Sequence, residues 1–181
     1  MRSISRSWGM REEEHFVDFP CDGVLQERDD ALYRAVSVNA SSKTVFRWLC
    51  QMRVAPYSYD LIDNLGRKSP QKIIPGLDQL QIGQRVMFIF NIVDFEQNKH
   101  ITIHTRKQSF LAKLFGYVVV SYCVFPDKSG CRLVVKLVIQ YPNTIVKWLF
   151  GPILAWGDLF MMRRQLLNFK KLSEHSDTII E

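Results

Sequence analysis

The most constraining feature of this sequence is an apolar pattern in its C-terminal part, from Pro142 to Lys171. Apolar side chains recur there at steps of three and four residues: Ile145, Trp148, Pro152, Ala155, Leu159, Met162, Leu166 and Phe169. Such steps place side chains on one face of an α-helix. Asn143 or Thr144 is suited to cap the first turn, because a short polar side chain accepts a hydrogen bond from an unpaired backbone N–H. A helix of about 28 residues would be roughly 42 Å long, so it would cross an entire small domain.

Gly151 and Pro152 interrupt this pattern. A proline inside a helix removes one backbone hydrogen bond and clashes with the preceding turn, so the pair predicts a kink or a break. The residues around it are apolar on nearly every side: Trp148, Leu149, Phe150, Ile153 and Leu154. That excess must be buried by a sheet, a partner subunit or a membrane surface. We favour burial, with this segment acting as a gate at the mouth of a cavity.

Composition excludes several classes of protein. With 181 residues, 47% of them hydrophobic, the chain suits one domain with a sizeable core. The net charge of +6 is not concentrated in a Lys/Arg block, so we expect no nucleic-acid partner. The four cysteines form no C-x-x-C pair and the N-terminus lacks an apolar signal core, which favours a cytoplasmic protein with reduced thiols. The apolar window 145–162 carries Lys147 and Asp158, so we expect no transmembrane segment.

The rest of the chain predicts one strand, two short helices and then four strands. Residues 1–29 are polar and irregular, which predicts a mobile N-terminal extension able to lie across the domain. Period-two alternation and amphipathic spacing then predict a strand at 31–39 and helices at 43–52 and 58–65. The remaining strand candidates are 84–93, 99–107, 117–125 and 131–141. The domain would cover residues 30–175, followed by a tail at 176–181.

In 131–141, apolar residues alternate with Arg132, Lys136 and Gln140, as in a strand with one face in water. Residues 108–116 fit either a loop or a short helical turn.

This order of elements is typical of an α+β architecture. Every apolar face is satisfied if an antiparallel sheet curls, the two short helices close one end, and the long helix lies in the concave side. A curved sheet cannot contact a straight helix everywhere, so the arrangement predicts a cavity between them. Such a cavity, lined by apolar and aromatic side chains, is the usual form of a small-molecule site.

Three segments of this chain resemble a known family. They are RAVSVNA at 34–40 leading into VFRWLCQM at 45–52, YSYDLIDNLG at 57–66, and GDLFMMRRQLL at 157–167. Over roughly residues 20–173 the chain resembles the SRPBCC superfamily, the START-like helix-grip proteins that include polyketide cyclase/dehydrase-like proteins. The resemblance implies a helix-grip fold, with a curved antiparallel sheet around a long C-terminal helix, and a cavity for lipids, polyketides or other apolar molecules. It implies no single chemistry and carries over no catalytic residues.

The candidate ligand-binding residues are Arg34, Trp48, Tyr57, Tyr59, Phe88, Leu133, Val135, Leu137, Trp156, Leu159 and Arg163. Tyr57 and Tyr59 fall near the expected cavity mouth, where a ring with a polar tip suits an amphipathic ligand. Trp48 and Trp156 are expected to face the interior, as ligand contacts or as plain core.

Arg34 shares its strand parity with Leu32 and Val36. An inward Arg34 could pair with a ligand carboxylate or with an internal acid such as Asp158. Exposure at the strand end is the alternative.

No metal or cofactor site is predicted. His100 and His104 lie in a strand pattern, where four residues span about 13 Å, and one zinc ion with Zn–N bonds near 2.1 Å cannot reach both. Cys123 and Cys131 flank a hairpin whose turn pairs Cys131 with residue 126, so we expect no disulfide between them. Motifs for nucleophilic, phosphate or metal chemistry are absent from the sequence.

The leading hypothesis is a cytoplasmic domain that binds a hydrophobic or amphipathic small molecule, lipid- or polyketide-like, in the cavity. The first alternative is a cyclase/dehydrase-type enzyme that uses the same cavity, so the sequence leaves catalysis open. The second is a peripheral membrane protein that handles lipids through the apolar first half of the long helix. The sequence fits a monomer or a homodimer equally.

Overall fold

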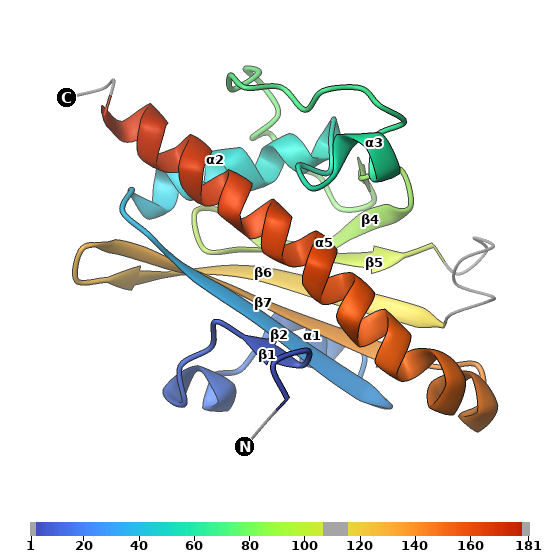
Figure 1. Ribbon diagram of the computed structural model, residues 1–181. Helices are drawn as coiled ribbons and strands as arrows, with labels where there is room; N and C mark the ends of the chain where they lie inside the picture. The colour runs from blue at the N-terminus through green and yellow to red at the C-terminus, as the bar shows by residue number, and fades with distance from the viewer. Residues whose placement is uncertain (1–2, 107–115, 179–181) are drawn as a thin grey trace.

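The computed structural model describes residues 3–106 and 116–178, which form one curved sheet crossed by a long helix (Figure 1). The strands are β1 (Ser7–Trp8), β2 (Asp30–Val38), β3 (Arg85–Val86), β4 (Phe90–Glu96), β5 (His100–Thr105), β6 (Tyr117–Asp127) and β7 (Gly130–Gln140). The helices are α1 (Pro20–Val24), α2 (Ser42–Cys50), α3 (Asp60–Asp63) and α5 (Thr144–Thr178), with 3-10 turns η1 (Glu13–Phe16) and η2 (Gln51–Arg53). The predicted α+β helix-grip architecture is confirmed.

The sheet has the strand order β1-β2-β7-β6-β5-β4-β3. All neighbours are antiparallel except β1, which lies parallel to β2 and was not expected. In the β6–β7 hairpin Pro126 pairs with Cys131, as predicted. All four cysteines lie among the described residues, and the structure joins none of them by a disulfide.

Several predicted boundaries differ from the observed ones. The predicted strand at 84–93 is two strands, because a turn with Met87 and Phe88 at positive φ separates β3 from β4. The predicted helix at 58–65 is reduced to α3 between Pro56 and Gly66. The prediction for 108–116 lies outside the described residues except at Gly116.

Helix α5 begins where the sequence predicts, but it continues to Thr178 rather than ending at Lys171. The side chain of Asn143 accepts a hydrogen bond from the backbone N–H of Val146 at 2.9 Å, which confirms it as a cap. The predicted break at Pro152 is wrong, because the helix is continuous through it. Pro152 lies on an exposed side of α5, so its ring does not displace a core side chain.

Only the later part of the predicted apolar face is buried. Met162, Leu166 and Phe169 pack against core residues of the sheet, at the spacing that the helical period requires, and Leu159 beside them is also buried. Before Ala155 the prediction is wrong, since Ile145 is 70% and Trp148 is 78% exposed. In Figure 1 the first turns of α5 lie beside the ends of the strands, so little sheet is available to cover them.

Helix α5 is also long and apolar enough to cross a membrane, judged by length and composition alone, between Thr144 and Ser176. Its most apolar window has a mean hydropathy of 1.3, and 22% of that window is buried. The later turns of the helix belong to the core of the domain. A core helix passes the same test of length and composition, so this finding is weak evidence for a membrane span.

The convex face of the sheet is covered, although the alternation in 131–141 predicted a face in water. Phe19, Cys21 and Leu25 of the N-terminal segment pack there against Val119 and Val134. Residues 3–29 therefore form a layer with its own strand and helix, where the sequence predicted irregular chain. Because the residues that cover this face are far away in sequence, local alternation could not reveal the cover.

Two buried cations hold this layer. Arg132 and Lys136, expected in water, are only 7% and 5% exposed. Glu14 accepts hydrogen bonds from Nε and Nη2 of Arg132 at 2.6 and 2.8 Å. The Lys136 ammonium lies 2.7 Å from Asp22. The alternating charges of β7 are therefore partners of the N-terminal acids rather than solvated groups.

Replacing Glu14 with Ala tests this arrangement. Breaking a buried ion pair leaves a buried charge without a partner, so we expect a loss of about 3 kcal/mol in the free energy of unfolding near neutral pH. Burial by itself raises the pKa of Glu14, but the hydrogen bonds from Arg132 and the Arg11 backbone outweigh it and lower that pKa. Because the pKa of Glu14 is lower in the folded protein, its ionised form stabilises the fold fully above about pH 4.5, the ordinary pKa of glutamate. This stabilisation is lost as the pH falls through the pKa of Glu14 in the folded protein.

Urea denaturation at about pH 7 and about pH 4 measures the effect. The difference between wild type and E14A should shrink at the lower pH. The matched control is Glu13→Ala, which removes an exposed carboxylate one residue earlier. Equal effects of the two substitutions would contradict the assignment.

Candidate functional site

Five of the predicted site residues lie in the interior between the sheet, α2 and α5. They are Arg34, Trp48, Tyr57, Leu133 and Val135. The ring centroid of Tyr57 is 6.0 Å from that of Trp48 and 5.3 Å from that of Phe169. Aromatic side chains of the protein thus fill the end of the space in which the sequence predicted a cavity.

Arg34 is inward and paired with an internal acid, as one of the two sequence alternatives proposed. Its Nη2 lies 2.8 Å from Oδ2 of Asp158, which connects β2 to α5. The guanidinium also donates to the carbonyl oxygens of Tyr33, Ser5 and Ala155 at 2.7, 2.8 and 3.1 Å. The alternative of strand-end exposure is wrong, since Arg34 is buried.

This pair sets the acid–base properties of the interior. Burial raises the pKa of Asp158 to about 6, although Arg34 acts in the opposite direction. Burial also lowers the pKa of Arg34. Nearby, the Tyr122 hydroxyl donates to Oε1 of Gln165 at 2.9 Å, and burial together with the charge of Asp158 raises the pKa of Tyr122. Tyr122 is therefore a neutral donor, and Asp158 is a carboxyl group that titrates near neutral pH.

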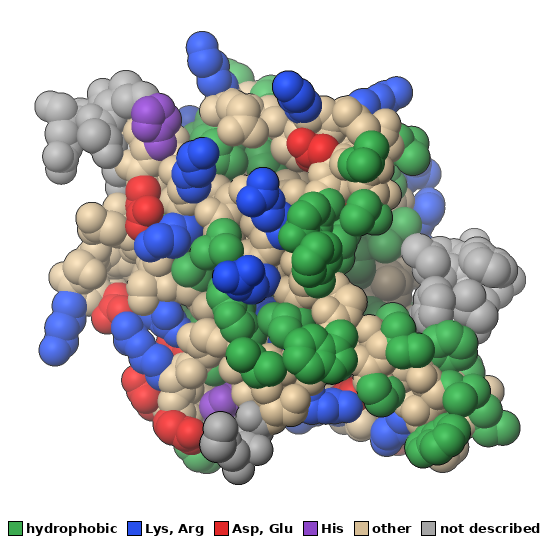
Figure 2. Space-filling model, viewed as in Figure 1, with side chains coloured by type: hydrophobic (Ala, Val, Ile, Leu, Met, Phe, Trp, Pro, Cys, Tyr) green, Lys and Arg blue, Asp and Glu red, His purple; other side chains and the backbone are tan. Residues whose placement is uncertain are grey.

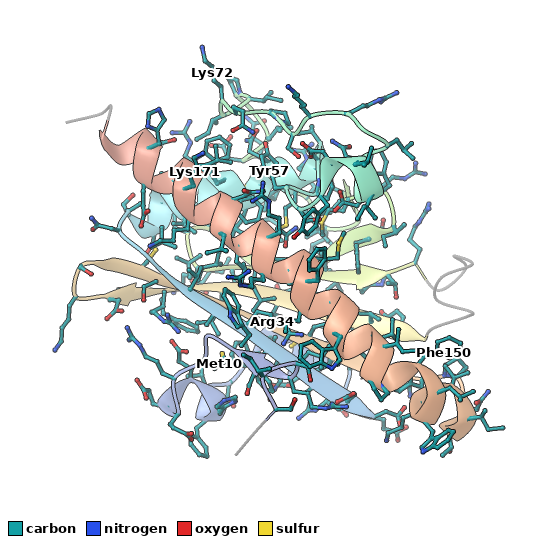
Figure 3. All side chains as sticks on the ribbon, in the orientation of Figure 1. Met10, Arg34, Tyr57, Lys72, Phe150 and Lys171 are labelled. Atoms are coloured by element: carbon teal, nitrogen blue, oxygen red, sulfur yellow. The ribbon has the colours of Figure 1, made fainter. Side chains whose placement is uncertain are left out.

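The surface of α5 that faces away from the sheet carries two adjoining pockets. A polar pocket of about 350 Å³ is lined by Tyr57, Ser58, Tyr59, Asp60, Ser69, Gln71, Arg164, Asn168, Lys171 and Leu172. A more apolar pocket of about 260 Å³ is lined by Tyr59, Trp156, Leu159, Phe160, Arg163, Arg164 and Leu167. Tyr59 and Arg164 line both, so we treat the two as one site, the α5 groove. Figure 3 labels Tyr57 and Lys171 at its polar end.

The polar end of the α5 groove is positively charged. Arg164, Asn168 and Lys171 follow one another at steps of four and three residues, so they share one face of α5. Asp60 is the acid among the lining residues, and its two oxygens accept hydrogen bonds from the backbone and hydroxyl of Ser69 at 2.9 and 2.5 Å. Within the described part of the chain, neither Arg164 nor Lys171 forms an ion pair. Both cations are therefore available to an anionic group.

Aromatic contacts order the apolar end. The rings of Tyr59 and Phe160 are stacked, with centroids 4.4 Å apart and an interplanar angle of 4°. The Arg164 guanidinium lies 5.9 Å from the centroid of Tyr59, and that of Arg163 lies 5.6 Å from the centroid of Trp8. These contacts hold long side chains in place before any ligand arrives, which reduces the entropy lost on binding.

Some residues that were predicted to lie in the interior lie outside it. Trp156 was expected to face inward but is 57% exposed, because it is about 100° around the helix from the buried Ala155. Phe88 is also exposed, in the turn between β3 and β4. Leu137 is partly buried between two core clusters. The α5 groove brings together the predicted Tyr57, Tyr59, Trp156, Leu159 and Arg163.

Sequence reasoning missed the polar half of the groove. Arg164, Asn168 and Lys171 are not among the residues that the sequence predicts to bind a ligand. Their spacing along α5 is the signal that could have found them. Ser69 could not have been found, since only the tertiary structure returns its loop to α5.

The described residues contain no group of three metal-ligating side chains. His100 and His104 lie in β5, as predicted, with Nε2 of His100 at 3.2 Å from Oδ2 of Asp94.

Comparison with solved structures supports the fold. The crystal structure of protein CV1439 from Chromobacterium violaceum matches with a TM-score of 0.52 at 12% identity, over 80% of this chain and 96% of that one. Protein NE0264 from Nitrosomonas europaea matches with a TM-score of 0.52 at 9% identity, over 81% and 95%. The di-domain ARO/CYC StfQ from the steffimycin biosynthetic pathway matches with a TM-score of 0.53 at 11% identity, over 81% of this chain and 51% of that one.

Neither protein-family models nor curated protein sequences match the chain. The structural neighbours are SRPBCC-type proteins, so the predicted resemblance is confirmed at the level of the fold. At these identities the likeness extends to the fold alone.

Substitutions of the interior pair test its role. Arg34→Met leaves Asp158 buried without a cation, which should destabilise the protein by about 3–5 kcal/mol at about pH 8. The pKa of Asp158 should rise further above its present value of about 6. A carboxyl group whose pKa is raised in the folded state lowers the free energy of unfolding as the pH rises from 3.8, its pKa in the unfolded chain, through its pKa in the folded protein. R34M should therefore recover stability at about pH 5.

The double variant R34M/D158L provides the control. It removes both charges, so urea denaturation at about pH 8 should show most of the lost stability restored. A double variant as unstable as R34M, or an R34M variant with no recovery at acidic pH, would show that the pair does not join β2 to α5.

Proposed function

We propose that this chain binds an amphipathic small molecule with an anionic head in the α5 groove. The apolar part of the ligand would contact Trp156, Leu159 and Phe160, and its head would lie near Arg164 and Lys171. The observation that supports this most directly is that an apolar pocket and a cationic pocket adjoin and share two side chains. An amphipathic molecule needs both surfaces in that relation.

Typical free energies indicate how much the apolar end and the polar end of the α5 groove would each contribute to affinity. Burying about six methylene groups would contribute about 5 kcal/mol, at about 0.8 kcal/mol each. Exposed cations such as Arg164 and Lys171 contribute about 0–1 kcal/mol apiece, because water screens them. Affinity would therefore come mainly from the apolar end. The polar end would orient the ligand and select its charge.

The enzyme alternative depends on Asp158, whose pKa of about 6 is suited to proton transfer. Its position speaks against that role for a ligand in the groove. At about 100° per residue, Asp158 is about 200° around the helix from Trp156. It therefore faces the sheet and Arg34, while the groove faces the other way. We thus favour binding over catalysis.

Titration with dodecyl phosphate below its micelle concentration, followed by tryptophan fluorescence and native mass spectrometry, tests the proposal. We expect saturable binding of one molecule per chain. Trp156→Ala should weaken it about tenfold, which corresponds to about 1.4 kcal/mol. The control Trp148→Ala removes another exposed tryptophan of α5 that lines neither pocket, and should leave affinity unchanged.

The charge of the head is tested separately. Arg164→Gln should weaken dodecyl phosphate binding by about threefold to tenfold and leave the binding of dodecanol unaltered. Lys43→Gln, at an exposed cation of α2, is the matched control. Equal losses for the two alkyl probes, or for R164Q and K43Q, would contradict a cationic head site.

A further inference from the structure

The first half of α5 exposes a continuous apolar stripe. It consists of Ile145, Trp148, Leu149, Ile153, Trp156 and Phe160, here called the α5 stripe. At steps of four, three and four residues, Leu149, Ile153, Trp156 and Phe160 lie on the side of the helix opposite the residues that face the sheet. Ile145 and Trp148 adjoin them in the first turns, which the sheet does not cover. Figure 2 shows apolar side chains gathered on this side of the molecule, at the lower right of the view. The α5 stripe includes two of the four tryptophans of the chain.

A second exposed apolar element lies next to it. Leu61, Ile62 and Leu65, here called the α3 tip, are among the most exposed large apolar residues described. The α3 tip joins the α5 stripe through Tyr59, immediately before α3, whose ring stacks on Phe160. The apolar surface therefore spans two elements rather than one helix.

The outward charges that α5 itself contributes beside this surface are cations. Between Thr144 and Arg164, all of which the structure describes, the sole carboxylate is Asp158, which faces inward to Arg34. The outward charges of this stretch are Lys147, Arg163 and Arg164. Lys147 lies 3.3 Å from Asp29 in a partly exposed pair, while Arg163 and Arg164 face aromatic rings.

The α3 tip shows the same bias. Its two acids are engaged within their own loop, Asp60 with Ser69 and Asp63 with the hydroxyl of Ser58. The exposed charges that follow it are Arg67 and Lys68.

We propose that the α5 stripe and the α3 tip dock on the surface of a bilayer that contains anionic lipids. Aromatic and aliphatic side chains with a cationic rim are the combination that binds an anionic lipid interface, with tryptophan at the headgroup level. A second copy of the chain fits this surface less well. It would bring Lys147, Arg163 and Arg164 against their own counterparts, with no outward carboxylate on this stretch to compensate.

Docking would also orient the α5 groove. Trp156 and Phe160 belong to both the stripe and the apolar pocket, so the groove would open at the lipid surface. An amphipathic ligand could then pass between bilayer and groove without crossing bulk water. This consequence rests on the proposed function, whereas docking itself does not.

Vesicle flotation tests the docking. Wild-type protein should bind vesicles of phosphatidylcholine and phosphatidylglycerol, bind pure phosphatidylcholine vesicles at least about tenfold more weakly, and dissociate in high salt. The double substitution Trp148→Ser/Ile153→Ser should lower partitioning at least about tenfold. Neither residue lines the groove, so this variant should retain the dodecyl phosphate affinity of the wild type.

The matched control is Phe16→Ser, at a residue that is 83% exposed in the N-terminal segment, away from α5. It should leave vesicle binding unchanged, and urea denaturation shows that both variants are folded. Docking is overturned if wild type binds neither vesicle type, or if F16S and the double variant lose binding equally. It is also overturned if sedimentation shows a dimer that the double substitution abolishes while vesicle binding persists. Failure of the groove proposal would appear separately, as no saturable dodecyl phosphate binding.

Discussion

The buried guanidinium of Arg34 is the interaction on which the arrangement of this protein depends. It binds groups from three segments: the carbonyl of Ser5 before β1, its own strand β2, and Ala155 and Asp158 on α5. A buried charge without partners would be very costly, so these segments can come together only in a way that satisfies it. The result fixes which side of α5 faces the sheet. Gln165 continues the same inner side two turns later, where Tyr122 donates to it.

Once the inner side of α5 is fixed, its outer side follows from the helical period. Asp158, Met162 and Phe169 face inward, so Trp156, Phe160 and Arg164 must face outward. The inner side carries the buried Arg34–Asp158 pair and core side chains, with aromatic rings packed at its Tyr57 end. The outer side holds the groove and the apolar stripe, which nothing in the described chain covers. The proposed functions therefore concern the side of α5 that does not pack against the sheet.

The N-terminal segment shows why both faces of the sheet are stable. Arg132 and Lys136 on β7 would be solvated on an open sheet, but Glu14 and Asp22 bring carboxylates to them and apolar residues exclude water around them. The Lys136 ammonium also lies over the rings of Phe19 and Tyr33. With this layer in place, the sheet exposes neither broad face. Unsatisfied apolar surface is left mainly at the overhanging part of α5 and at the α3 tip.

Local patterns in the sequence determined the strands β2, β5, β6 and β7, the hairpin register at Cys131, the cap at Asn143 and the inward parity of Arg34. Each depends on neighbours within a few residues, or on a period that the backbone imposes. The resemblance of three segments to the SRPBCC superfamily added the helix-grip fold. Tertiary structure alone decided that the convex face is covered, that Trp148 and Trp156 are exposed, and that the loop with Ser69 meets Arg164. Whether a face is buried depends on which elements from distant parts of the chain pack against it. A periodic sequence specifies which side chains share a face, but not how much of that face another element covers.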